Sequence, residues 1–175
     1  MGDRLSLGMA ADAFPVLGQC IHGVPLAYLD NAATTQVPLQ VLAAMRRFEE
    51  HDRANIHRGV HTLSQRATHA FEQARATLKR FVGADTRHEL VFTSGTTEAL
   101  NLVAHGLSAP GDAPAVLQRG DEIVVSGLEH HANLIPWQAA ARRSGASLRI
   151  LRPDAQGRLH AHDLKTLLTP RTRVF

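Results

Sequence analysis

A continuous apolar run, Glu122-Ile-Val-Val-Ser126, limits most strongly what this chain can fold into. A run without polar alternation suits a strand that is buried on both faces, as in a parallel sheet. Periodic apolar residues before and after it, for example from Leu134 to Arg143, predict helices. Strands that alternate with helices imply right-handed crossovers. The sequence therefore predicts an α/β fold with an open, mostly parallel sheet flanked by helices.

The expected elements follow one another along the whole chain. Residues 1–24 are expected to form an irregular arm, and 52–62 a loop between helices. The helix over 63–81 is expected to lie along a sheet or a subunit partner. The expected strands are 27–29, 89–93, 122–126, 148–151 and a last one beginning at 173, and the expected helices are 38–51, 63–81, 96–107, 134–143 and 160–168.

Composition narrows the class of protein. With 175 residues and 44% hydrophobic content, the chain can bury a core. No apolar run approaches the roughly 20 residues of a membrane helix, and the N-terminus lacks a secretory pattern, so we expect a cytoplasmic protein without a membrane segment. The net charge of +3 and the scattered arginines do not predict nucleic-acid binding. The single cysteine, Cys20, excludes an internal disulfide, and a buried small side chain is favoured over a reactive thiol.

The stretch Phe92-Thr-Ser-Gly-Thr-Thr-Glu98 follows an expected strand and opens a helix. Gly95 lets the backbone come close to a ligand. The hydroxyls of Thr96 and Thr97 stand beside the first free N–H groups, where the helix dipole favours an anion. This pattern favours a phosphate-binding turn. The alternative is that Ser94, Thr96 and Thr97 only cap the helix and that Glu98 complements its dipole.

Two pairs of histidines are candidates for chemistry. His130 and His131 are adjacent in an expected loop after a strand, which makes them a poor pair of metal ligands, and we expect no metal site. A neutral imidazole can instead lie flat against an aromatic cofactor and exchange protons near pH 7, and a histidine bonded to backbone carbonyls is the alternative. His57 and His61 are expected to straddle a loop and a helix start, either solvated or touching substrate. No dinucleotide or Walker-type phosphate loop is present.

Four motifs in order resemble a known family, the pyridoxal-phosphate (PLP)-dependent cysteine desulfurases of the SufS/CsdA type, within the class V aminotransferases. The resemblance runs from about Phe14 to Phe175. The motifs are Tyr28-Leu-Asp-Asn-Ala-Ala-Thr-Thr35, Asn55-Ile-His-Arg-Gly-Val-His-Thr-Leu-Ser64, Phe92-Thr-Ser-Gly-Thr-Thr-Glu-Ala-Leu-Asn-Leu-Val103 and Glu129-His-His-Ala-Asn-Leu-Ile-Pro-Trp137.

The resemblance implies a fold, a cofactor and a set of site residues. The fold is that of the large domain of aspartate aminotransferase-like PLP-dependent transferases, with an N-terminal arm at 1–24 and the first half of the PLP-binding domain at 25–175. The implied site residues are Gly95, Thr96 and Thr97 for the cofactor phosphate, His130 for stacking on the pyridine ring with a proton-transfer role, and Ala32 and His57 near the substrate.

The resemblance also implies an activity. L-cysteine would lose its sulfur to an enzyme cysteine as a persulfide and leave L-alanine, with the cofactor as electron sink. The implied partners are a second subunit in a homodimer and a sulfur-acceptor protein, and the implied pathway is iron–sulfur cluster assembly. The alternatives are another class V PLP enzyme, such as a selenocysteine lyase, epimerase or transaminase, or a non-catalytic half-domain that pairs with a larger subunit.

The chain departs from this family in length and in key residues. Members of the family are considerably longer, and the additional part supplies the Schiff-base lysine and the sulfur-accepting cysteine. Here Lys79 and Lys165 are the only lysines, and Cys20 lies in the arm. We therefore expect an N-terminal half, incomplete at its C-terminus and inactive by itself.

Overall fold

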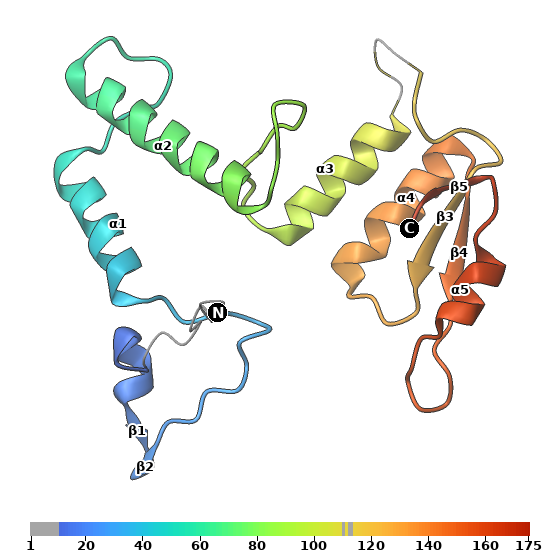
Figure 1. The fold of residues 1–175 in the computed structure, drawn as a ribbon, viewed down its shortest axis with the longest axis horizontal. Helices are drawn as coiled ribbons and strands as arrows, with labels where there is room; N and C mark the ends of the chain where they lie inside the picture. The colour runs from blue at the N-terminus through green and yellow to red at the C-terminus, as the bar shows by residue number, and fades with distance from the viewer. Residues whose placement is uncertain (1–10, 110, 112–113) are drawn as a thin grey trace, which may run out of the picture. The chain divides into compact units, whose positions relative to one another are not determined.

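The structure is a computed structural model that describes residues 11–109, 111 and 114–175 (Figure 1). It divides into two compact units, Met1–Leu90 and Val91–Phe175. The expected division into an arm at 1–24 and a domain from residue 25 remains a prediction.

The first unit begins with short elements. Two 3-10 turns, η1 (Ala11–Ala13) and η2 (Pro15–Gly18), precede an antiparallel hairpin of β1 (Cys20–Ile21) and β2 (Val24–Pro25). His22 and Gly23 turn the hairpin with positive φ angles of 52° and 79°. Cys20 is exposed, so the expectation of a buried thiol is wrong. The physical reason is that the hairpin has only two residues in each strand and all of its residues are exposed, so it has no interior.

Two helices follow as expected, α1 (Leu39–His51) and α2 (Thr62–Phe81). Pro38 is the N-cap of α1, with an extended φ of −75° and ψ of 155°. The backbone beyond α2 reverses at Gly83, whose φ is 70°. The strand expected at 27–29 is absent from the described hydrogen-bonding ladders. Instead the Tyr28 hydroxyl donates to the carbonyls of Asp30 and Thr34, which makes this segment a local turn.

The apolar face predicted for α1 is largely open. Val41, Leu42 and Met45 are 45%, 43% and 60% exposed. Among the described residues of this unit, the buried side chains are those of Ser64 and Ala67 on α2. The hydrophobic pattern of residues 38–51 therefore predicted helix α1 correctly. The sheet or subunit partner expected for α2 remains a prediction.

The second unit has a three-stranded parallel sheet. Its strands are β3 (Glu122–Ser126), β4 (Ser147–Leu151) and β5 (Thr172–Val174), in the order β4-β3-β5. Glu122 pairs with Ser147 and Ser126 with Leu151, in unbroken register. The helices of this unit are α3 (Thr96–Ser108), the 3-10 turn η3 (His131–Asn133), α4 (Ile135–Ser144) and α5 (Ala161–Leu167). The predicted α/β fold is confirmed.

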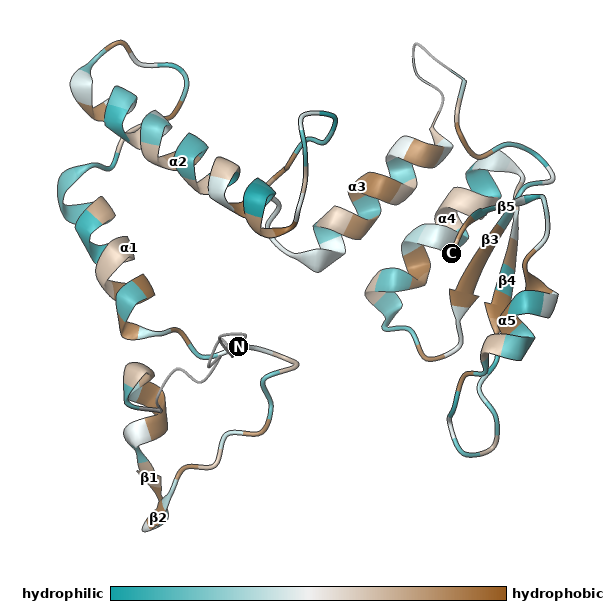
Figure 2. Cartoon of the chain, viewed as in Figure 1, coloured by the Kyte–Doolittle hydropathy of each residue, from teal (hydrophilic) through white to brown (hydrophobic). Residues whose placement is uncertain are grey.

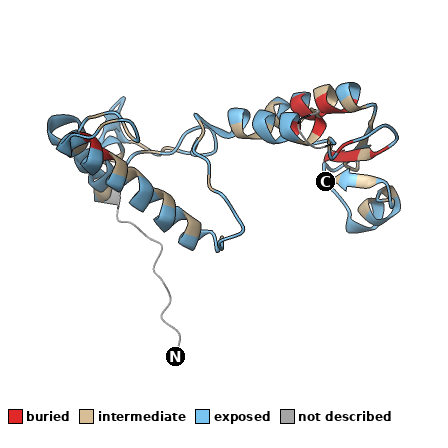
Figure 3. Ribbon diagram, turned by 90° about the horizontal axis from the view of Figure 1, so that it is seen from above, coloured by how far each residue is buried: buried red, intermediate tan, exposed pale blue. Residues whose placement is uncertain are grey.

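The strand order places helices on both faces of this sheet. The chain passes from β3 to β4 through α4, and then returns across β3 to β5 through α5. Because both crossovers are right-handed but run in opposite directions, α4 and α5 fall on opposite faces (Figures 1 and 3). Ile123, Val124 and Val125 are 0%, 1% and 6% exposed, which explains the continuous apolar run of β3 (Figure 2).

The core of the second unit lies between β3 and the helix pair α3–α4. Ile123 and Val125 pack there with Leu117 and Trp137, among the buried residues shown in Figure 3. The Arg143 guanidinium donates to the buried Ser108 hydroxyl at 2.8 and 3.0 Å and so ties α4 to α3. Gly145 ends α4 in the left-handed region with φ 73°.

The strand expected at 89–93 does not form. These residues lie outside the ladders that the structure describes, although α3 begins directly after them as expected. Val91 is 63% exposed and Phe92 41% exposed. An apolar run specifies a strand only where a neighbour accepts its ladder hydrogen bonds, and that neighbour is a tertiary matter.

Candidate cofactor-binding site

At the N-terminus of α3, some of the described polar groups bond to one another and others have no protein partner. Gly95 is the N-cap and has extended backbone, with φ 163° and ψ 179°, and no side-chain cap. A Cβ at Gly95 would meet no atom within 4 Å, so the space beside it is open. The Thr93 hydroxyl donates to the Gly95 carbonyl at 3.1 Å and holds the turn.

Ser94 and Glu98 bond to each other at the N-terminus of α3. The Ser94 N–H and hydroxyl both donate to Glu98 Oε2 at 2.6 Å. The Ser94 hydroxyl, followed by its backbone N–H, lowers the pKa of Glu98 below its usual value. The Ser94 hydroxyl therefore donates to Glu98 and does not cap a free N–H group of the helix, and the N-cap residue of α3 has no side-chain cap.

Thr96 and Thr97 differ from Ser94 in their hydrogen bonding. Within the described ranges, neither hydroxyl makes a hydrogen bond to the protein, and the two backbone N–H groups also have no acceptor. Both residues are exposed in the first turn of a 13-residue helix. Two hydroxyls and adjacent N–H donors at a positive helix end form a donor set suited to a phosphate.

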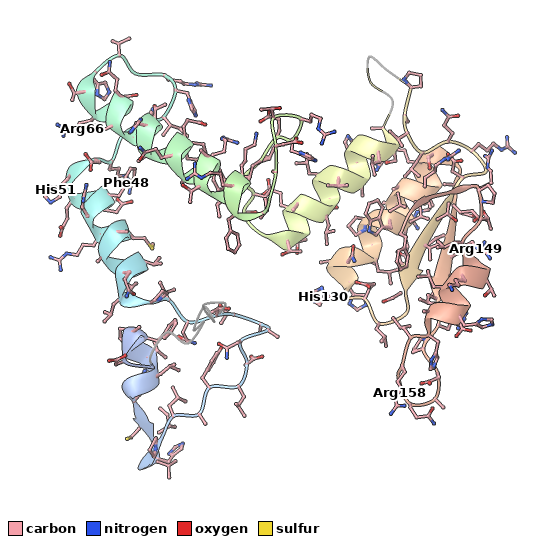
Figure 4. All side chains as sticks on the ribbon, viewed as in Figure 1. Phe48, His51, Arg66, His130, Arg149 and Arg158 are labelled. Carbon is pink, nitrogen blue, oxygen red and sulfur yellow. The ribbon has the colours of Figure 1, made fainter. Side chains whose placement is uncertain are left out.

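His130 lies at the turn between β3 and α4 (Figure 4). It is the N-cap of η3, and its Nδ1 accepts a hydrogen bond from the Ala132 N–H at 3.1 Å. Because Nδ1 acts as acceptor, a neutral ring carries its proton on Nε2. The ring is exposed and stands 6.3 Å from that of His131, at 65°. The bond to an N–H group differs from the carbonyl-bonded histidine considered as an alternative.

The fold brings the α3 turn and the His130 loop into the same unit. α3 packs against both η3 and α4. The loop of His130 begins at the carboxyl end of β3, where the strand order reverses, because β4 lies on one side of β3 and β5 on the other. Such a switch point is the usual place for a ligand in an open α/β sheet.

A network that sequence reasoning missed supports the His130 loop. Glu129 accepts from the Ser126 hydroxyl at 2.7 Å and from the Asn133 side-chain amide at 2.8 Å. The Trp137 indole N–H donates to Asn133 Oδ1 at 2.9 Å. Trp137 is 6% exposed and lies in the core. These residues border a hollow of about 400 Å³ that Leu100 of α3 and Phe175 also line.

Ala32 and His57 belong to the first unit. Ala32 lies exposed in a turn at 31–33. His57 has a positive φ of 62°, and its backbone N–H donates to Thr68 Oγ1 at 2.9 Å. Its Nε2 lies 3.3 Å from Glu72 Oε1. His61 instead caps α2 by accepting from the Ser64 N–H at 3.3 Å, which confirms that this histidine pair straddles a loop and a helix start. The substrate roles of Ala32 and His57 remain predictions.

In the described parts of the chain, no three or more His, Cys, Asp or Glu side chains are grouped to hold a metal ion. Over the same residues, no helix has the length and apolar character needed to cross a membrane. Lys79 on α2 donates to the His88 carbonyl at 2.6 Å.

Comparisons with known proteins agree on one family. The family described as Aminotransferase class-V matches residues 27–175. A "Probable cysteine desulfurase" of Staphylococcus aureus (strain Mu50 / ATCC 700699) is 45% identical over 161 residues, which are 92% of this chain and 38% of that protein. The chain thus spans well under half the length of such relatives.

Solved structures give the same result. A cysteine desulfurase from Thermococcus onnurineus NA1, solved in its apo form, superposes with a TM-score of 0.74 at 40% identity, over 85% of this chain and 36% of that one. The Escherichia coli cysteine desulfurase CsdA superposes with a TM-score of 0.67 at 34% identity, over 94% of this chain and 39% of that one.

Proposed function

The chain belongs to the class-V aminotransferase family, and from that premise we propose that its protein is a PLP-dependent cysteine desulfurase. The reaction moves sulfur from L-cysteine to a protein thiol, giving a persulfide and L-alanine. The observation that carries the proposal is the unused donor set of Thr96 and Thr97 at the start of α3, in the unit that also holds His130. The desulfurase relatives and structures lend further support.

The donor set fits the phosphate of PLP. The hydroxyls and N–H groups of Thr96 and Thr97 would hold the phosphate, and Gly95 leaves open space beside them. When bound, PLP supplies an electron sink for bond cleavage next to the amino group of the substrate. His130 would lie against the pyridine ring and hold a proton at Nε2, because its Nδ1 is engaged by the Ala132 N–H.

The remaining parts of the proposal concern substrate, partners and place. Ala32 and His57 would contact L-cysteine. The protein would act as a homodimer in the cytoplasm and pass sulfur to an acceptor protein for iron–sulfur cluster assembly. A single cysteine without a disulfide partner is in keeping with a reducing compartment.

Measuring PLP affinity in threonine variants tests the cofactor assignment. Thr96→Val and Thr97→Val each remove one hydroxyl donor, so the dissociation constant for PLP should rise roughly tenfold or more per variant, the cost of a hydrogen bond to a charged group. Thr62→Val is the matched control, because Thr62 is likewise exposed and is the first residue of α2.

The outcome separates the cofactor from the activity. Equal PLP affinity in all four proteins, or no PLP binding by the protein isolated from its source, would overturn the cofactor assignment. L-alanine formation from L-cysteine, assayed with the protein isolated from its source, tests the desulfurase activity. Release of another product from L-cysteine would reassign the protein within the family.

A further inference from the structure

In the polar network beneath the His130 loop, it is fixed which group donates and which accepts in each hydrogen bond. The Trp137 indole can only donate, and it donates to Asn133 Oδ1. The Asn133 amide nitrogen is thereby turned toward Glu129 Oε2, at 2.8 Å. From the other side, the Leu128 N–H donates to the Ser126 hydroxyl at 3.3 Å, which leaves the Ser126 proton for Glu129.

The hydrogen bonds that run from Trp137 through Asn133 and from Leu128 through Ser126 therefore both end at the Glu129 carboxylate. Glu129 Oε1 receives the Ser126 proton at 2.7 Å, and Oε2 receives the Asn133 proton. Only a group that accepts at both oxygens satisfies this arrangement. An ionised carboxylate does so, whereas an amide must point a donor at one of the two partners.

The carboxylate also joins three pieces of the unit that surround His130. Ser126 is the last residue of β3, Asn133 ends η3, and Trp137 lies in α4 with its ring in the core. His130 directly follows Glu129 and precedes η3, so its backbone lies inside the segment that the network clamps. The clamp hence determines where the imidazole stands before any ligand arrives.

We infer that Glu129 is a positioning residue, which holds the His130 loop in place through Ser126 and the Asn133–Trp137 pair. The inference deepens the proposed function, since it concerns the side chain assigned there to the cofactor ring. Glu129 itself acts through the loop. Its ionised form is what the donor directions require, so the substitution that changes least in shape, Glu129→Gln, is also the most informative one.

The first experiment measures amide hydrogen exchange of Ala132 in the full chain without cofactor. The Ala132 N–H is bonded to His130 Nδ1, so its protection reports directly on the His130 position. In Glu129→Gln we expect its exchange to accelerate at least threefold. Glu50→Gln, on exposed α1 in the other unit, should leave it unchanged. Unchanged protection in Glu129→Gln would overturn the inference.

A double-mutant cycle tests the direction of the donors. In Glu129→Gln, the new amide donor faces either the Ser126 hydroxyl oxygen or the Asn133 side chain. In the second case Asn133 turns its Oδ1 toward the new donor, and its amide then faces the Trp137 N–H, donor against donor. Trp137→Phe removes that N–H. The Glu129→Gln effect on Ala132 exchange should therefore be much smaller in the Trp137→Phe background. Additive effects would contradict the part of the inference that runs through the Asn133–Trp137 pair.

Cofactor affinity separates this inference from the proposed function. We expect Glu129→Gln to weaken PLP binding about tenfold, as outer-shell partners do, and His130→Ala to weaken it further. If His130→Ala weakens PLP binding while Glu129→Gln does not, the positioning role falls and the proposed function stands. If the protein isolated from its source binds no PLP, the proposed function falls, and the exchange cycle still decides whether Glu129 holds the loop.

Discussion

Carboxylates at the turns of the second unit are held by hydroxyl and N–H donors. Glu98 is bonded by Ser94, and Glu129 by Ser126 and Asn133. In Glu129 the Ser126 hydroxyl is the main cause of a lowered pKa, followed by the Asn133 amide. Each of these residues remains ionised while it orders a segment beside the candidate site.

Asp154 and His160 offer a measurable pH response. His160 Nε2 lies 2.7 Å from Asp154 Oδ2. The Arg158 N–H and then the His160 ring lower the pKa of Asp154, and Asp154 raises the pKa of His160 above its usual value of 6.5. The Asp154 contribution to stability is present above its unfolded pKa and is lost as pH falls through the lowered folded value. The His160 contribution is present below its unfolded pKa and is lost as pH rises through the raised folded value.

The pair is thus fully formed only between the lowered pKa of Asp154 and the raised pKa of His160. We predict that Asp154→Asn lowers the pKa of His160, as followed by NMR titration of its ring protons. Asp85→Asn, which removes an exposed carboxylate of the other unit, is the control and should leave the His160 titration unchanged. An unchanged His160 titration in Asp154→Asn would mean that the ion pair does not form in solution.

At the scale of elements, the start of α2 is the most tightly built turn of the first unit. The buried Ser64 hydroxyl donates to the Asn55 carbonyl at 2.6 Å and accepts from the Gly59 N–H at 3.0 Å. A Cβ at Gly59 would stand 2.6 Å from both Cβ and Oγ of Ser64. The loop and the helix therefore meet where only glycine fits.

We predict that Gly59→Ala destabilises the protein by about 1–3 kcal/mol, the usual cost of overpacking. Ser64 is fully buried and cannot move aside. Urea unfolding followed by circular dichroism measures the change. Gly18→Ala is the control, since a Cβ there meets no atom within 4 Å, and its unfolding midpoint should stay near that of the unsubstituted chain.

Gly106 in α3 presents the opposite case. It lies exposed inside the helix, and an added Cβ would meet nothing within 4 Å. Because alanine favours a helix interior over glycine, Gly106→Ala should stabilise the protein by roughly 0.5–1 kcal/mol. A lower midpoint in the same urea experiment would show that the position is occupied in solution.

At the scale of the whole molecule, buried apolar side chains are unevenly distributed. Those of the described residues lie almost entirely in the second unit, with Ala67 as the exception in the first. Trp137, the only tryptophan, belongs to that core. Fluorescence therefore reports the unfolding of the second unit specifically.

We predict that Leu117→Ala lowers the unfolding free energy of the second unit by about 2–5 kcal/mol, because Leu117 is 1% exposed in the core. Leu102→Ala, which removes the same atoms from a side chain that is 53% exposed, should change it by less than about 1 kcal/mol. Urea unfolding followed by Trp137 fluorescence makes the comparison. Equal losses would place Leu102 in a buried environment in solution.

Local patterns were enough to predict most of the elements. The periodicity of α2, the apolar run of β3 and the terminating Gly145 each act over a few residues, so the sequence alone places them. The turn at Gly95 and the loop of His130 were also found from sequence, although their ligand roles remain proposals.

Packing decided what lies beyond that local range. Residues 89–93 formed no ladder because a strand depends on a neighbour distant in sequence, and Cys20 is exposed because its hairpin encloses no interior. The central place of β3 and the clamp of Glu129 depend on which donors the fold brings within hydrogen-bonding distance. Which group donates and which accepts depends on contacts in three dimensions. It therefore cannot be predicted from neighbouring residues in the sequence.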